Sequence, residues 1–168
     1  TASVCCYEIL KEQGIVPVIA AGHSLGEYSA LVAAGSISFA DAVRTVHLRG
    51  KFMQEAVPLG KGGMAAVIGL DAQRITEICD SVSTGDKPVQ AVNFNCPGQT
   101  VIAGESSSVA KACESLKEAG AKRAIMLKVS APFHSVLMEP AAKRLKAVLD
   151  EIEIKDAEIP VIANFSAR

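Results

Sequence analysis

The sequence predicts an α/β fold in which a small subdomain interrupts a larger parallel-sheet domain. An apolar, β-branched run at residues 15–21 leads through Gly-His-Ser-Leu-Gly into a helix-forming stretch. Between residues 60 and 129 the expected element order is β-α-β-β-α-β, the order of a ferredoxin-like unit. A further helix and strand follow this unit. We therefore expect an α/β-hydrolase-like domain at 1–59 and 130–168, with a ferredoxin-like subdomain at 60–129.

Composition and charge exclude several classes of protein. Of the 168 residues, 49% are apolar and 21% charged, and the formal net charge is -1, a balance typical of a globular protein with a real core. No basic patch stands out, so we expect no nucleic-acid partner. No apolar run approaches the ~18 residues of a transmembrane helix, so we expect no membrane span. The N-terminus lacks a secretory signal pattern and a starting Met, which indicates part of a longer or processed chain.

Cysteine usage predicts the compartment and argues against a metal. The 5 cysteines show no C-x-x-C spacing and no adjacent His, so we expect no zinc or other metal site. An odd number of unpatterned cysteines suits a reducing compartment, either the cytoplasm or an organelle matrix.

Glycines, capping residues and apolar periodicity mark the elements of the larger domain. Ser38 and Asp41 resemble a capping box ahead of a long helix that opens at Phe39. Pro140 suits the first turn of a later helix. Around these positions we expect a helix at 2–13, a strand at 15–21, a helix at 25–34, and a last strand at 159–164.

The smaller subdomain begins after a turn-rich linker at 57–63. Asp71 is expected to cap its first helix, and Ser106 or Ser107 to start its second, which Gly120 ends. A loop at residues 95–99, from Asn95 to Gln99, is expected to join two strands of the subdomain. The expected elements are strands at 64–70, 89–93, 100–104 and 124–129, with helices at 71–83 and from 106 or 107 to 120.

Ser24 is the candidate nucleophile. It occupies the centre of G-x-S-x-G at a predicted strand-to-helix turn, where the glycines allow backbone and helix to approach closely. Free N–H groups at the helix N-terminus favour developing negative charge, and the Leu25 N–H is placed to be an oxyanion donor. The alternative is a serine that only caps a helix.

Arg49 is the candidate anion-binding residue. On a helical wheel it lies at the edge of the apolar arc of its helix, whereas Arg44 and Lys51 lie on the opposite, polar face. A guanidinium that points toward packed surface needs an anion. The alternative is an arginine whose stem covers apolar surface while its head stays in water, and periodicity alone leaves both open.

Four motifs in one order carry a resemblance to a known family. They are Gly-His-Ser-Leu-Gly-Glu-Tyr at 22–28, Arg-Gly-Lys-Phe-Met-Gln-Glu-Ala at 49–56, Asn-Phe-Asn-Cys-Pro-Gly-Gln at 93–99, and Ser-Ala-Pro-Phe-His-Ser at 130–135. The chain resembles the malonyl-CoA:acyl carrier protein transacylases and the related acyltransferase domains of fatty acid and polyketide synthases. The resemblance covers essentially the whole chain, although members of the family are longer at both ends.

The resemblance implies a role for each matching residue. The residues themselves leave the catalytic base open among three histidines, but the family's matching histidine is the general base, which implies this role for His134. The matching arginine binds the malonyl carboxylate, which implies this role for Arg49. The resemblance also implies that Leu25 and Phe133 suit malonyl rather than methylmalonyl. It further implies substrate contacts for Met53, Asn93 and Asn95, although turn formation beside Pro-Gly explains both asparagines equally well.

The implied reaction is ping-pong transfer of malonyl from coenzyme A to the phosphopantetheine thiol of acyl carrier protein, through an acyl-serine. Malonyl-CoA and acyl carrier protein are the expected partners, malonyl-CoA being a substrate, and we expect no cofactor and a monomer. Two parts of the family's site would lie outside this chain. A loop rich in Gln and Gly, which supplies the second oxyanion donor, would precede Thr1, and a segment that orients the histidine would follow Arg168.

Two rival functions remain open from the sequence. A serine esterase or thioesterase would use Ser, Asp and His in chain order. None of the aspartates between Ser24 and His134 follows a strand where a third triad member belongs, and Asp41 and Asp71 look like helix caps. A non-catalytic piece of the transacylase, or a module that only docks carrier protein, is the other rival.

Overall fold

The computed structural model describes residues 1–129 and 131–168, so Ser130 of the fourth motif lies outside the described residues. The chain forms two compact units. The first unit comprises Thr1–Gly50 and Leu145–Arg168, and the second comprises Lys51–Arg144. Both boundaries fall inside helices, namely α3 (Phe39–Ala56) and α6 (Glu139–Leu149), so each of these helices contributes to both units.

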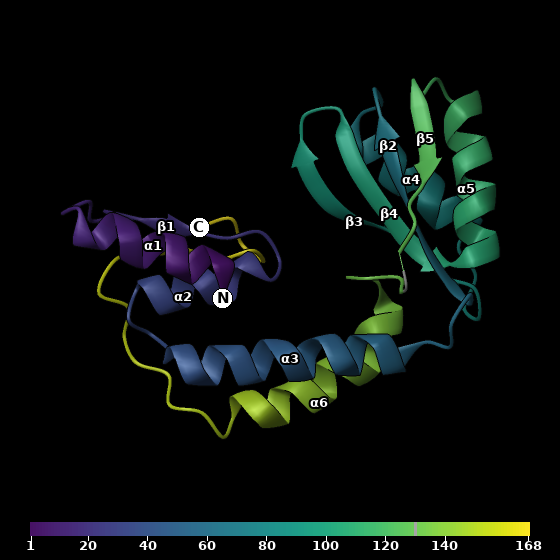
Figure 1. Ribbon diagram of the computed structural model, residues 1–168. Helices are drawn as coiled ribbons and strands as arrows, with labels where there is room; N and C mark the ends of the chain where they lie inside the picture. The colour runs from purple at the N-terminus through teal and green to yellow at the C-terminus, as the bar shows by residue number, and fades with distance from the viewer. Residues whose placement is uncertain (130) are drawn as a thin grey trace. The chain divides into compact units, whose positions relative to one another are not determined.

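A parallel pair of strands organises the first unit. β1 (Ala20–Ala21) pairs in parallel with β6 (Val161–Ile162), which brings segments from opposite ends of the chain together. α1 (Ala2–Glu12) packs against α2 (Gly26–Ala33), and α2 packs against β1 (Figure 1). The turn between β1 and α2 therefore lies next to the residues that follow β6.

Both strands of this pair are shorter than predicted. We predicted strands over 15–21 and 159–164, but two residues of each are paired. In the described part of the chain no third strand joins this sheet, and the side chains of Val16 and Val18 are 69% and 84% exposed. A strand forms where a neighbour accepts its hydrogen bonds, and parallel strands are normally buried on both faces.

An antiparallel sheet forms the centre of the second unit. Its strands lie in the order β3-β4-β2-β5, and every neighbouring pair is antiparallel. Along the chain, the elements follow the predicted order of strand, helix, two strands, helix and strand. They are β2 (Gly62–Ile68), α4 (Ala72–Val82), β3 (Val89–Cys96), β4 (Gln99–Glu105), α5 (Ser106–Glu118) and β5 (Arg123–Met126).

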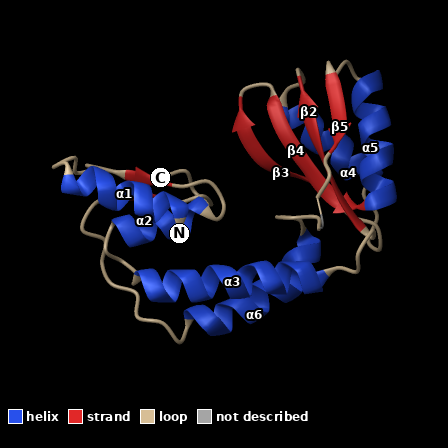
Figure 2. Cartoon of the chain, in the orientation of Figure 1, coloured by secondary structure: helices blue, strands red, loops and turns tan. Residues whose placement is uncertain are grey.

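α4 and α5 pack against one face of this sheet (Figure 2). Side chains from both helices and all four strands form a single buried cluster between the two layers, because alternate strand residues point to the same face. The cluster comprises Ala65, Val67, Ile75, Ile78, Cys79, Val82, Val89, Ile102, Val109, Ala112, Cys113, Leu116 and Ala124.

The other face of the sheet carries a smaller apolar cluster. Met64, Val101 and Ala103 are buried there, and Phe133 packs against them. Phe133 belongs to the loop that follows β5 and leads into a short 3-10 helix, η1 (Val136–Met138), and then α6. The sheet therefore carries the helices on one face and the loop of the fourth motif on the other.

Two helix caps agree with the sequence, and a third comes from a residue to which the sequence assigned no role. Ser38 and Asp41 form the predicted capping box, since the Asp41 N–H donates to Ser38 Oγ and the Ser38 hydroxyl donates to Asp41 Oδ2. Asp71 caps α4 by accepting from two backbone N–H groups. α5 begins at Ser106, as predicted, but its cap is Glu105, whose carboxylate accepts from the Ser107 and Ser108 N–H groups.

Candidate active site

The turn at Gly22–Gly26 joins β1 to α2, as the motif predicts. Ser24 at its centre has a φ of 54°, in the left-handed region that non-glycine residues rarely occupy. Such a conformation costs free energy and persists only where the surrounding structure determines it, and it recurs at functional sites. The backbone of Ser24 is therefore independent support for a functional serine, beyond the residue types of the motif.

The two glycines of the turn have different roles. A Cβ atom at Gly22 would lie 2.0 Å from the backbone carbon and oxygen of Gly26, a separation that no real structure tolerates. A Cβ atom at Gly26 would meet nothing within 4 Å. The expectation that both glycines serve close approach is thus correct for Gly22 and wrong for Gly26.

Leu25 stands immediately before α2 and contributes a hydrogen-bond donor. The Gly26 N–H donates to the His23 carbonyl, and the Glu27 N–H donates to the Ser24 carbonyl. The Leu25 N–H, in contrast, donates to no acceptor within residues 1–129 and 131–168. This N–H lies at a helix N-terminus, next to Ser24. It can donate a hydrogen bond that stabilises negative charge developing on an acyl oxygen.

The guanidinium of Arg49 lies beside the Ser24 side chain. Its Nη2 donates to Ser24 Oγ at 2.9 Å. In the described part of the chain Arg49 forms no ion pair with an Asp or Glu. Its charge also reaches Tyr28, where burial raises the pKa of the phenol and the positive charge of Arg49 opposes that rise. A half-buried cation without a carboxylate partner therefore stands next to the hydroxyl.

Asn164 contacts the same turn from the segment that follows β6. Its Oδ1 accepts from the Ser24 N–H at 2.8 Å, and its Nδ2 donates to the Gly22 carbonyl. Sequence reasoning placed Asn164 at the end of a strand and gave it no role. A polar amide directly after an apolar run was the available signal, but the contact spans 140 positions and depends on the pairing of β1 with β6.

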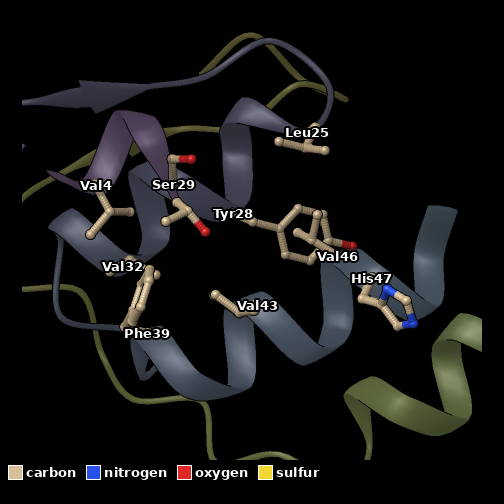
Figure 3. A pocket seen from close by; sticks show the side chains of 11 residues that line it. Val4, Leu25, Tyr28, Ser29, Val32, Phe39, Val43, Val46 and His47 are labelled. Atoms are coloured by element: carbon tan, nitrogen blue, oxygen red, sulfur yellow. The ribbon is translucent and has the colours of Figure 1, made fainter. Parts of the chain in front are cut away.

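An apolar hollow of about 200 Å³ lies among the helices of the first unit (Figure 3). Leu25 and Tyr28 line it from the start of α2, and Val43, Val46 and His47 line it from α3. Ser24 and Arg49 do not line this hollow. It can bind apolar groups beside the turn, whereas the polar chemistry of the first unit lies at Ser24.

His134 belongs to the second unit and also has a left-handed backbone, with a φ of 65°. Short hydrogen bonds hold the loop around it, because the Phe133 N–H donates to the Ala131 carbonyl and the Ser135 hydroxyl donates to the Pro132 carbonyl at 2.7 Å. The N–H of Val136 donates to Gln90 Oε1 on β3 at 2.7 Å. Hydrogen bonds within the loop therefore hold its conformation around His134, and one bond after His134 connects it to β3.

The other candidate residues also lie in the second unit. Met53 and Phe133 pack together against a buried cluster of Val57, Ala131 and Met138. Asn93 and Asn95 lie within β3, so the turn-forming interpretation of these asparagines is wrong. The pairing of β3 with β4 is irregular just before Asn93 and at Asn95, and such bulges redirect side chains.

The described residues show no metal site, and the two buried cysteines have raised pKa values. The described part of the chain contains no group of three or more His, Cys, Asp or Glu side chains arranged to hold a metal ion. All five cysteines are unpaired. Burial raises the pKa of Cys79 to about 12 and also raises that of Cys113, so both thiols stay protonated. None of the helices in this part of the chain combines the length and apolar character needed to cross a membrane.

Comparison with known proteins identifies the family. The match to the acyl transferase domain family runs from residue 2 to residue 168. The chain belongs to the acyl transferase domain family. Among curated relatives, the malonyl CoA-acyl carrier protein transacylase of Bacillus subtilis is 58% identical over 167 residues, covering 99% of this chain and 53% of the relative. The transacylase of Escherichia coli is 53% identical over 169 residues, covering 100% of this chain and 54% of the relative.

Solved structures of malonyl transferases match the fold of this chain. The acyl-carrier-protein S-malonyltransferase of Burkholderia pseudomallei matches with a TM-score of 0.95 and 49% identity, over 99% of this chain and 54% of the other. A malonyl-transacylase solved in complex with a type II PKS acyl-carrier protein matches with a TM-score of 0.96 and 50% identity, over the same shares. The chain spans about half the length of the curated relatives it matches.

Proposed function

We propose that this chain carries the nucleophile of an enzyme that transfers malonyl from coenzyme A to the phosphopantetheine thiol of acyl carrier protein, in fatty acid or polyketide biosynthesis. The relatives named malonyl CoA-acyl carrier protein transacylase support this assignment. The observation that carries it is the contact between Arg49 and Ser24, at 2.9 Å. A cation beside the attacking hydroxyl suits an acyl group that ends in a free carboxylate.

The first half of the proposed cycle forms an acyl-enzyme. Ser24 Oγ attacks the thioester carbonyl of malonyl-CoA while His134 accepts the hydroxyl proton. The carbonyl oxygen becomes an oxyanion that accepts a hydrogen bond from the Leu25 N–H. The carbon–sulfur bond then breaks, the carbonyl re-forms, and His134 returns its proton to the departing coenzyme A sulfur.

The second half transfers the acyl group to the carrier. The phosphopantetheine thiol gives its proton to His134 and attacks the acyl-serine. The oxyanion forms again beside Leu25, and the ester bond to Ser24 breaks. His134 protonates Ser24 Oγ, and malonyl leaves as a thioester of the carrier protein. Proton transfer of this kind contributes about 10²–10⁴ in rate.

Arg49 selects the acyl group in this proposal. The malonyl carboxylate pairs with the guanidinium and displaces it from the serine hydroxyl, whereas acetyl leaves the guanidinium without a carboxylate. Leu25 and Phe133 favour malonyl over methylmalonyl, and Met53, Asn93 and Asn95 contact substrate. These roles follow from the positions of the residues in the family motifs. No cofactor takes part in this cycle.

The proposed architecture follows the same resemblance. The first and last segments, 1–59 and 130–168, belong to an α/β-hydrolase-like domain, and residues 60–129 form a ferredoxin-like insertion. The sheet order β3-β4-β2-β5 with two helices on one face supports the second assignment. We also propose that the protein is a monomer and that it works in a reducing compartment. The five unpaired cysteines support the second of these proposals.

The test uses a full-length form, in which residues 1–168 replace the matching half of the Bacillus subtilis relative. The purified full-length form is mixed with malonyl-CoA, with and without acyl carrier protein. The intact masses of the enzyme and of the carrier protein are then recorded. We expect malonyl on the enzyme without carrier and on the carrier when it is present. Release of malonate to water at the same rate with or without carrier would instead identify a thioesterase, and absence of any adduct would identify a non-catalytic scaffold.

A further inference from the structure

The Asn164 side chain hydrogen-bonds to the backbone of the turn on both sides of His23. Its amide oxygen accepts from the Ser24 N–H at 2.8 Å, and its amide nitrogen donates to the Gly22 carbonyl. One planar group thereby connects the residue before His23 to the residue after it. We propose that Asn164 is a positioning residue, which holds the turn in the conformation that presents the Ser24 hydroxyl.

The register of the parallel strands explains how Asn164 reaches the turn. Ala21 pairs with Ile162, and these residues are the last of β1 and β6. Gly22 follows Ala21 directly, while Asn164 lies two residues beyond Ile162. The side-chain amide therefore continues the hydrogen bonding of the strand pair past its last backbone pair, into the turn. Asn164, Gly22 and His23 also share the lining of one surface hollow.

Backbone bonds within the turn do not use the two groups that Asn164 binds. The His23 carbonyl accepts from Gly26, and the Ser24 carbonyl accepts from Glu27, which starts α2. These bonds use neither the Ser24 N–H nor the Gly22 carbonyl. One group needs an acceptor and the other a donor, and a carboxamide supplies both from one side chain.

The two hydrogen bonds of Asn164, to the Ser24 N–H and the Gly22 carbonyl, form a clamp on the turn. The left-handed backbone of Ser24 gives this clamp a function. A serine at a φ of 54° is strained, so neighbouring contacts must hold it there. Without the clamp, Ser24 can relax toward ordinary backbone angles, which moves its Oγ and its contact with Arg49. The clamp also occupies the Ser24 N–H, which leaves the Leu25 N–H as the oxyanion donor of this turn.

The catalytic part of this inference rests on the proposed function. Because Asn164 contacts the turn and not the acyl group, its loss should reduce turnover and leave substrate affinity unchanged. A misplacement of about 1 Å can cost about 10²-fold in rate. We therefore expect Asn164→Leu, which has similar size and neither polar group, to lower kcat of the full-length form roughly 10- to 100-fold, with KM for malonyl-CoA changed by less than about twofold.

Two further variants separate the clamp from general damage to the C-terminal segment. Asn164→Asp keeps an acceptor for the Ser24 N–H but directs a carboxylate oxygen at the Gly22 carbonyl, so it should also lose turnover at neutral pH. Ser166→Ala removes a hydroxyl that donates to the Arg168 carbonyl in the same segment, and it should keep wild-type kcat. Equal kcat in wild type, Asn164→Leu and Asn164→Asp would overturn the proposal, as would a loss that merely follows the fraction of folded protein.

A second measurement tests the clamp without catalysis. In a Ser24→Gly background the left-handed turn carries no strain, since glycine adopts positive φ readily. We expect Asn164→Leu to lower the thermal midpoint less in this background than in the Ser24 background. Equal shifts in both backgrounds would contradict the clamp. If wild type forms no acyl-enzyme, the proposed function fails, while this comparison of midpoints still decides whether Asn164 holds the turn.

Discussion

At the residue scale, backbone conformation distinguishes the two residues assigned to catalysis. Ser24 and His134 have φ values of 54° and 65°, and Ala167 is the only other non-glycine residue with positive φ in the described part of the chain. Each of the two is held by hydrogen bonds in its own unit. The inference runs from an observed strained backbone to a function, and here it agrees with the chemistry of the side chains.

Arg49→Ala tests whether the guanidinium selects the acyl group. A charge-assisted hydrogen bond is worth roughly 1.5–3 kcal/mol, so malonyl transfer by the full-length form should fall about 10- to 150-fold. Transfer of acetyl should stay constant or rise, because no carboxylate is lost and an unpaired cation is removed. Initial rates with malonyl-CoA and with acetyl-CoA measure these two effects of the substitution.

The matched control is Arg44→Ala, which removes an exposed arginine from the same helix. It should leave both rates unchanged. If Arg49→Ala reduced malonyl and acetyl transfer equally, Arg49 would support the fold, and its assignment to the malonyl carboxylate would be wrong.

The glycine pair of the turn offers a second comparison at this scale. Gly22→Ala forces a Cβ atom to within 2.0 Å of the Gly26 backbone, so the turn must open and acylation should fall by about 10²-fold or more. Gly26→Ala meets open space at the first residue of α2 and should keep acylation within about twofold of wild type. Rates of acyl-enzyme formation in the full-length form decide this, and comparable losses in both variants would show that the turn is built differently.

At the element scale, the start of α5 depends on one carboxylate. Hydrogen bonds from the Ser107 hydroxyl and from the Ser108 and Ser107 N–H groups hold the pKa of Glu105 below its usual range, against a small opposing effect of burial. A carboxyl with a lower pKa in the folded than in the unfolded state stabilises the fold above the unfolded pKa. That stabilisation is lost as pH falls through the folded pKa.

Glu105→Ala should therefore lower the free energy of unfolding at pH 7 by about 0.5–2 kcal/mol, the usual effect of removing a side-chain N-cap. As pH falls through the lowered pKa of Glu105, the free energy of unfolding of the wild type should approach that of the variant, because the carboxylate becomes protonated. Urea unfolding at several pH values measures the difference. Glu114→Ala, an exposed position on the same helix, should show no such pH dependence, and a pH-independent effect of Glu105→Ala would rule out the carboxylate cap.

How far the sequence predicts an element depends on whether the element is determined locally. Asp71 and the Ser38–Asp41 box were predicted because their partners lie within three residues. Glu105 was missed because serine is the commoner cap and serines follow it directly. The strand at 15–21 was predicted too long because its extent depends on distant partners. Ser24 was proposed from its motif, and Arg49 from the family resemblance after periodicity had left its role open. Asn164 could not be predicted, because its contact depends on the pairing of β1 with β6.

At the scale of the whole molecule, the two units differ in how completely they bury apolar side chains. The second unit has a large cluster whose members all lie between Ala65 and Ala124. In the first unit, α1 contains no buried residue, and apolar side chains at 15–19 are exposed. The second unit therefore contains what it needs to fold by itself.

We accordingly expect isolated residues 60–129 to fold, with one cooperative thermal transition and a mixed α/β circular dichroism spectrum. Isolated residues 51–144 should be more stable by roughly 1 kcal/mol or more, because Phe133 then covers Met64 and Ala103 on the second face of the sheet. A disordered spectrum for both fragments would contradict the assignment of an independent subdomain.

The measurement that tests the account most directly is the location of the acyl group. The full-length form is incubated with malonyl-CoA, stopped in acid and digested, and the modified peptide is sequenced by mass spectrometry, with Ser24→Ala treated in parallel. The account predicts malonyl on Ser24 in the wild type and no adduct in the variant. An adduct on Cys96 or on another serine, or an undiminished adduct in Ser24→Ala, would contradict it.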